Sequence, residues 1–258
     1  MPHSLSGRHI GRAFEAPFAD PLASRKLAIG SGLVLLGYLI PILPSLLFYG
    51  YLVRLMRSVL RSGETALPEW GDWGQAMWDG LRLWAVGFVY RLPAYLLFAL
   101  ALLSMAEIPF AIQVWAEQGP ETSPFWIALP YVELAGLGAG MLASALVGAL
   151  IGIVLPAIVA HVVAHNDVAA AFRPGEWWPI DAARPSTYLI VFVLMGACSL
   201  ALSMLAQVLS ASLLRCCLVP LVVSPLRAYL RMVSSILFAF AYRSASPASG
   251  HTALDRIH

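Results

Sequence analysis

Four ionisable side chains lie inside long apolar stretches of the sequence, where a charge is costly unless it has a partner or a function. Glu107 and Glu133 fall in two successive stretches, and Arg227 and Arg231 lie four residues apart on one helical face of the last stretch. A carboxylate that meets a guanidinium between helices forms a buried ion pair, which fixes helix register without adding stability. The same groups would also serve as a proton or ion path. We favour the structural pair because such groups are few.

His161 and His165 are one helical turn apart at the end of the third apolar stretch. This spacing puts two imidazoles on one face, as a metal-binding pair requires. No Glu follows His161, as a metalloprotease motif would need, and no third ligand is evident. We therefore expect a solvated pair at the membrane interface, with a metal or a tetrapyrrole as the weaker alternative, and we predict no cofactor.

Signatures of enzymatic chemistry are missing from the sequence. It has no Gly-rich phosphate loop ending in Lys, no GxSxG nucleophile elbow and no HExxH motif. Glu69 and Asp72, two carboxylates three residues apart, fit the acidic start of a helix better than a general acid–base pair. The net charge of +2 and the lack of a basic cluster argue against nucleic-acid binding. We predict that the chain has no catalytic residues and is not an enzyme.

The elements that must hold these residues are membrane helices. Hydrophobic residues make up 60% of the 258 positions and charged residues 12%, half of the roughly 25% that is usual in soluble domains. Each apolar stretch reaches the roughly 20 residues that a spanning helix needs, and a helix satisfies its own backbone polar groups. We predict an all-α polytopic transmembrane bundle of about five spans. The spans lie near residues 27–53, 92–115, 126–162, 186–213 and 217–242, in a single transmembrane domain (27–242) between a polar N-terminal segment (1–26) and a polar C-terminal tail (243–258).

The first predicted span contains Pro41 and Pro44, which break or bend a helix because proline removes a helical hydrogen bond. The segment 54–82 is rich in arginine, whereas the segment 116–124 has no Lys or Arg. The positive-inside rule therefore places 54–82 and the C-terminus in the cytoplasm. Basic residues ahead of the first span also favour the cytoplasm, which five full spans do not allow. A re-entrant first segment is the alternative that resolves this conflict.

The segment 70–88 is amphipathic and rich in tryptophan. Apolar side chains recur there at steps of three to four residues, opposite a polar stripe. Tryptophan favours the headgroup region, so we predict an interfacial helix that turns into the membrane near Arg91 and Pro93. The interfacial anchors are Trp70, Trp73, Trp78 and Trp84.

Small residues repeat every four positions along the third apolar stretch. On a helix this spacing forms a ridge without bulky side chains, which lets helix backbones approach closely in a membrane. We favour packing within the chain, and docking onto a partner subunit is the alternative. The stretch is too long for one upright span, so the helix tilts or bends near 136–140. The ridge consists of Gly136, Gly140, Ser144, Gly148, Gly152, Pro156 and Ala160.

Several short motifs in the first third of the chain resemble the DUF4013 family of uncharacterised prokaryotic membrane proteins. They are Pro17-Phe18-Ala19-Asp20-Pro21, Gly50-Tyr51 with Arg54 and Arg57, Leu67-Pro68-Glu69-Trp70, Gly80-Leu81 and Tyr90-Arg91-Leu92-Pro93. A weaker similarity continues through 169–172 and 188–189. The resemblance implies a helical integral membrane protein and implies no chemistry.

The first function we expect is that of a non-enzymatic accessory or structural subunit in the prokaryotic inner membrane. Such a subunit would pack against lipid and against other membrane proteins or copies of itself. The alternative is a small-solute or ion permease or channel that uses the intramembrane Glu and Arg residues.

Overall fold

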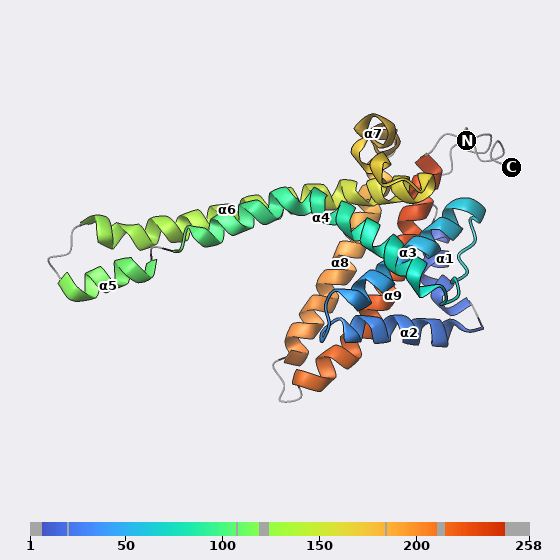
Figure 1. Cartoon of the computed structure of the whole chain (residues 1–258), viewed down its shortest axis with the longest axis horizontal. Coiled ribbons are helices and arrows are strands. Elements are labelled where there is room, and N and C mark those ends of the chain that lie inside the picture. Colours follow the sequence, from blue (N-terminus) through green and yellow to red (C-terminus); the bar gives the residue numbers. More distant parts are fainter. Residues whose placement is uncertain are drawn as a thin grey trace. The chain divides into compact units, whose positions relative to one another are not determined.

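A computed structural model describes residues 7–19, 21–106, 108–118, 124–183, 185–210 and 215–245. These residues form helices joined by short turns and contain no strand, which confirms the all-α class (Figure 1). By length and composition, four helices of the described part are suited to cross a membrane, one fewer than the five predicted spans. The stretches that contain them are Trp73–Val114, Ile127–His165, Pro185–Leu209 and Val219–Ala245, and the first stretch extends past a turn at 104–106.

The chain divides into two compact units. The first comprises Met1–Val86 and Ile153–His258, and the second comprises Gly87–Gly152. The boundaries fall inside α4 (Trp73–Leu103) and α6 (Pro124–His165), so each of these two helices contributes to both units. This division was not predicted from the sequence, which we treated as one transmembrane domain.

Helix α9 (Arg215–Ala245) is the centre of the first unit. It packs against α1 (Gly7–Ala19), α2 (Ala23–Leu36), α3 (Leu43–Ser62), α7 (Pro174–Ala183) and α8 (Pro185–Ser210), and Figure 1 shows α2, α3 and α8 beside it. One stripe of α9 is apolar and buried, because residues four apart share a helical face. The largest fully buried side chains of this core include Phe48, Tyr51, Leu55, Val59, Met232, Ile236 and Leu237.

The stretch 27–53, predicted to be bent or broken near Pro41 and Pro44, consists of two helices. Helix α2 ends at Leu36, the chain turns through 37–42, and α3 begins at Leu43. Pro44 fits the first turn of α3, where its missing N–H has no helical partner to lose. Helix α2 has 14 residues and rises roughly 21 Å, too little for a hydrocarbon core of about 30 Å. The break is the one that the re-entrant alternative requires, and the re-entrant path itself stays a prediction.

Helix α4 is not interrupted near Arg91 and Pro93, where we predicted that the chain turns into the membrane. Helix α4 runs through Pro93 to Leu103, so the tryptophan-rich helix and the second span form one element. The chain instead turns at 104–106, before α5 (Ile108–Gln118). Pro109 explains this position, because its ring would clash with the carbonyl four residues earlier in a continuous helix.

The third apolar stretch forms α6, which has 42 residues and is not interrupted at 136–140. It is followed by a short 3-10 helix (Val168–Phe172) and by α7. Helices α8 and α9 lie within a few residues of the last two predicted spans. Residues 246–258 of the predicted tail lie outside the described part of the chain.

Candidate functional site

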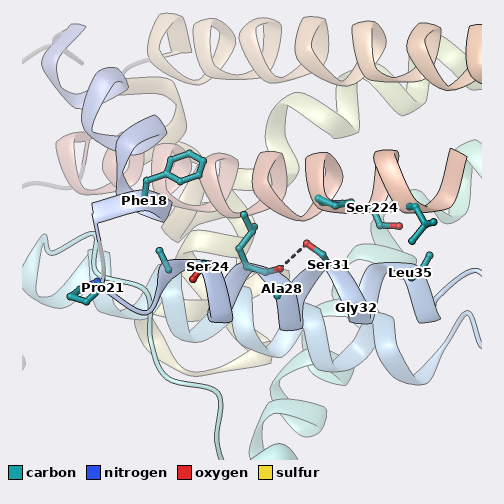
Figure 2. A pocket seen from close by; sticks show the side chains of 12 residues that line it. Phe18, Pro21, Ser24, Ala28, Ser31, Gly32, Leu35 and Ser224 are labelled. Carbon is teal, nitrogen blue, oxygen red and sulfur yellow. Dashed lines mark hydrogen bonds between the residues drawn. The ribbon is translucent and has the colours of Figure 1, made fainter. Parts of the chain in front are cut away.

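An open groove of about 750 Å³ lies along α2 and α9. Figure 2 shows Ser24, Ala28, Ser31 and Leu35 along α2, with Ser224 on α9 across the groove. The Ser31 hydroxyl donates to the Leu27 carbonyl oxygen at 2.7 Å. Small side chains on this face of α2 leave room for the groove. They are visible in the sequence, but we did not use them to predict a groove.

Ser224 is a buried polar residue in the wall of this groove. It is 1% exposed, and its hydroxyl has no hydrogen-bond partner among the described residues. The other walls are mainly aliphatic or aromatic. The groove is therefore suited to an apolar molecule rather than to a reaction that needs acid–base groups.

A buried ion pair joins α3 to α4. The Arg57 guanidinium lies 3.5 Å from an Asp79 carboxylate oxygen, and the Asp79 side chain is 3% exposed. Arg57 also donates to the Asn166 side-chain oxygen at 3.1 Å, and Gln75 donates to the second Asp79 oxygen at 3.0 Å. A cavity of about 20 Å³ beside this cluster has room for roughly one water molecule. The Asp79 oxygen that faces Arg57 has this ion pair but no hydrogen-bond partner among the described residues.

Arg54, one turn before Arg57, fixes the start of α4. It donates to the backbone carbonyl oxygens of Gly71 and Asp72. The Asp72 carboxylate accepts a hydrogen bond from the backbone N–H of Gln75 at 3.2 Å. Asp72 therefore caps the start of α4, as its position predicts. This hydrogen bond gives the Asp72 carboxylate a structural role at the start of α4.

Trp70 is held by protein contacts. Its ring stacks on Tyr51 with centroids 3.9 Å apart, and its indole N–H donates to the Lys26 carbonyl oxygen at 3.0 Å. The Lys26 ammonium is buried and donates to the Leu67 carbonyl oxygen at 2.6 Å. Trp70 thus differs from the other predicted anchors Trp73, Trp78 and Trp84, which are about half exposed. The membrane role of all four stays a prediction.

His161 is not the solvated residue that we expected. It is 2% exposed, and its ring nitrogens lie 2.8 Å from the Tyr242 hydroxyl and 3.3 Å from a Glu176 carboxylate oxygen. His165 is exposed, and its ring nitrogen lies 3.0 Å from the His161 carbonyl oxygen. No group of three potential metal ligands occurs among the described residues. The His161 ring therefore connects α6, α7 and α9 instead of presenting a free nitrogen.

We expect the variant Tyr242→Phe to be less stable by about 1 kcal/mol, because it removes the buried hydrogen bond to His161. The apparent Tm in detergent would then fall by roughly 2–4 °C. Tyr131→Phe is the matched control, because Tyr131 is largely exposed. Equal Tm values for both variants would show that the Tyr242–His161 contact adds nothing to stability.

Arg227 and Arg231 contact tyrosines rather than carboxylates. Arg227 donates to the Tyr38 hydroxyl at 2.9 Å, and the Arg231 guanidinium lies 5.4 Å from the centre of the Tyr49 ring. Neither arginine has a carboxylate within ion-pair distance in the described part of the chain. The predicted Glu–Arg ion pair is not among the contacts that the structure describes.

A family model described as "Protein of unknown function (DUF4013)" matches residues 33–211. The chain belongs to the DUF4013 family. No curated protein and no solved structure matches it. Together with its long apolar helices, this membership makes the chain a membrane protein of a family whose activity is unknown.

The DUF4013 match divides the candidate sites. It includes the Arg57–Asp79 ion pair and the whole of the second unit. It ends before α9 and begins near the end of α2, so the groove is formed mostly by residues outside the matched region.

The small-residue ridge of this DUF4013 protein faces α4 within the second unit. A Cβ added at Gly136 or Gly148 would make ordinary contact with Ser104 or Ala94, and the Ser144 hydroxyl donates to the Ala94 carbonyl oxygen at 2.8 Å. Farther along the ridge, Ala160 is fully buried in the core of the first unit. The contacts of the ridge are therefore made within the chain.

We expect Gly140→Leu to destabilise the second unit by about 1–3 kcal/mol through overpacking. A Cβ at Gly140 would lie 2.5 Å from the Cβ of Ala101, whereas a Cβ at Gly138 would meet nothing within 4 Å. Gly138→Leu is therefore the matched control. Thermal unfolding of both variants in detergent tests the difference, and an equal loss of stability in both would contradict the assigned packing face.

Glu133 is the predicted intramembrane glutamate of this unit that the structure describes. It is 8% exposed, and one of its carboxylate oxygens has no hydrogen-bond partner among the described residues. Glu107 lies outside the described residues. Glu133 has no ion pair with an arginine among the described residues.

Proposed function

We propose that this protein is a non-enzymatic accessory subunit of the prokaryotic inner membrane, and that the second unit packs laterally against another membrane protein. The observation that supports this proposal is the apolar character of the exposed surface of that unit. Its small residues are used between α4 and α6, whereas large apolar side chains point away from this seam. They include Leu96, Leu100, Leu142, Leu146 and Leu150.

The length of α6 exceeds what one bilayer covers, and the first unit accounts for part of it. Its apolar part, Ile127–His165, has 39 residues and rises roughly 58 Å along its axis. A hydrocarbon core is about 30 Å thick, and tilts of membrane helices rarely exceed about 40°. The first unit covers the part Ile153–His165, which includes the fully buried Ala160, and the exposed leucines of the second unit are left for lipid and for the neighbouring protein that we propose.

The polar clusters of the first unit support a structural role. Arg57 and Asp79 form an ion pair with each other, and the two ring nitrogens of His161 are both within reach of protein partners. These groups fix helices relative to one another within that unit. The basic residues of α3 support our proposal that this end and the C-terminus face the cytoplasm.

Site-specific photocrosslinking in native membranes tests the proposal. A benzophenone amino acid at Leu142, Leu146 or Leu150 is expected to give one protein adduct of constant mass. The same probe at Ala160, which is fully buried, should give none. Lipid adducts alone at every outward position, or adducts of twice the chain mass, would contradict packing against a different membrane protein.

A permease is the second candidate. The observation that favours it is the helix break at 37–42 beside Arg227, because broken helices commonly flank transport sites. Solute flux into proteoliposomes that depends on Arg227 and Arg231, without any protein adduct, would favour this candidate over the first.

A further inference from the structure

The break between α2 and α3 opens a pocket of about 170 Å³. The end of α2 contributes Gly37 and Tyr38, the first turn of α3 contributes Ser45, and α9 contributes Arg227 and Arg231. Within the described part of the chain, no acidic residue lines the pocket. Two cations thus face a cavity that holds no opposing charge.

The donors of both arginines are largely unused. Arg227 has one hydrogen bond, to the Tyr38 hydroxyl. The Arg231 guanidinium contacts the Tyr49 ring and has no hydrogen-bond acceptor or ion-pair partner within the described residues. Both lie inside the candidate span Val219–Ala245, where an arginine without an anionic partner is costly. The pocket therefore favours an anion.

The backbone around the pocket adds to this preference. The first backbone amides of α3 have no intrahelical acceptor. Ile42, the N-cap residue that precedes the helix, provides no side-chain hydrogen bond to them. The carbonyl oxygens that end α2 are used within the turn, since Gly37 donates to Leu33 and both Leu39 and Ile40 donate to Leu36. The positive end of α3 thus remains available, and the negative end of α2 is largely neutralised.

We propose that this pocket binds a phosphate-like oxyanion, either free or as the headgroup of an anionic lipid. The planar guanidinium forks of Arg227 and Arg231 match the geometry of phosphate oxygens. The Tyr38 hydroxyl oxygen accepts from Arg227, so its own proton is available for a third contact. The cavity of about 170 Å³ is several times larger than the ~30 Å³ that one water occupies in the liquid, enough for a tetrahedral anion.

Binding to the full-length protein in a nonionic detergent tests this site. The probes are inorganic phosphate, short-chain phosphatidic acid and, as the uncharged control, short-chain diacylglycerol. We expect one or both anions to bind and the uncharged control not to bind. Phosphate binding identifies a free anion as sufficient, whereas binding of phosphatidic acid alone identifies a lipid headgroup. Failure of both anions to bind would overturn the proposal.

The double variant Arg227→Gln/Arg231→Gln is expected to bind the anion roughly 10- to 100-fold more weakly, because it loses charge-assisted hydrogen bonds. Arg12→Gln/Arg25→Gln removes the same charge from two exposed positions and should bind normally. Equal losses in both variants would refute the site.

Hydrogen exchange on the wild-type protein gives an answer even if the double variant does not fold. Anion-dependent protection is expected in peptides that cover 37–46, and protection elsewhere only would also refute the site. None of these readouts depends on the photocrosslinks from the second unit, so either proposal can fail alone.

Discussion

The variants Gly50→Ala and Gly80→Ala are expected to lose more than about 3 kcal/mol of stability each, because a methyl group has no space at either position. A Cβ at Gly50 would overlap the carbonyl oxygen of Ala76, and a Cβ at Gly80 would overlap the carbonyl oxygen of Leu46. Helices α3 and α4 therefore cross with their backbones in contact. A backbone carbonyl cannot move aside as a flexible side chain can, so the helices would have to separate.

Thermal unfolding in detergent measures this loss, which should lower the apparent Tm by more than roughly 6 °C. Gly74→Ala is the matched control, because Gly74 lies on α4, the helix of Gly80, and a Cβ there would meet nothing within 4 Å. A variant of Gly50 or Gly80 that is as stable as the control would mean that the two helices do not cross here.

The variant Arg57→Gln is expected to cost about 3–5 kcal/mol, because it leaves the buried Asp79 carboxylate without a counter-charge. The double variant Arg57→Gln/Asp79→Asn should recover most of this loss, since both charges are then removed. Gln75 still has an oxygen acceptor in the double variant. The effects of the two substitutions on stability are therefore expected to depend on each other.

A double-mutant cycle based on thermal unfolding measures this coupling. Arg173→Gln is the control, because the Arg173–Asp167 pair is about half exposed on both sides and should contribute no more than about 1 kcal/mol. If the losses from Arg57→Gln and Asp79→Asn simply add, the two side chains do not form a coupled pair.

The sequence predicts the fold class well because long apolar stretches permit little else than helices. It predicts the helix boundaries less well. Pro93 and Pro109 look alike in the sequence, yet α4 continues through the first and the chain turns before the second. Packing decides the difference, because Ala94 and Ala101, which follow Pro93, contact α6.

The polar clusters could not be predicted from local spacing. The partners of His161 include Tyr242, which is 81 positions away, and the spacing of His161 and His165 reports only on their own helix. Asp79 looks like part of the polar stripe of an interfacial helix, and its burial depends on Arg57 in α3. Tertiary contacts thus set the role of each residue. The pair Gly50 and Gly80 was found within motifs, whereas its close backbone contact requires the structure.

Lys26 is the one lysine among the 258 residues, and it is 7% exposed with its ammonium group on the Leu67 carbonyl oxygen. Lysine-directed reagents therefore have a single side-chain target, which the native fold protects. A lysine-specific protease or an acylating label can reach it only when α2 and the segment 67–70 separate. The rate of reaction at Lys26 would therefore report how often this part of the first unit opens locally.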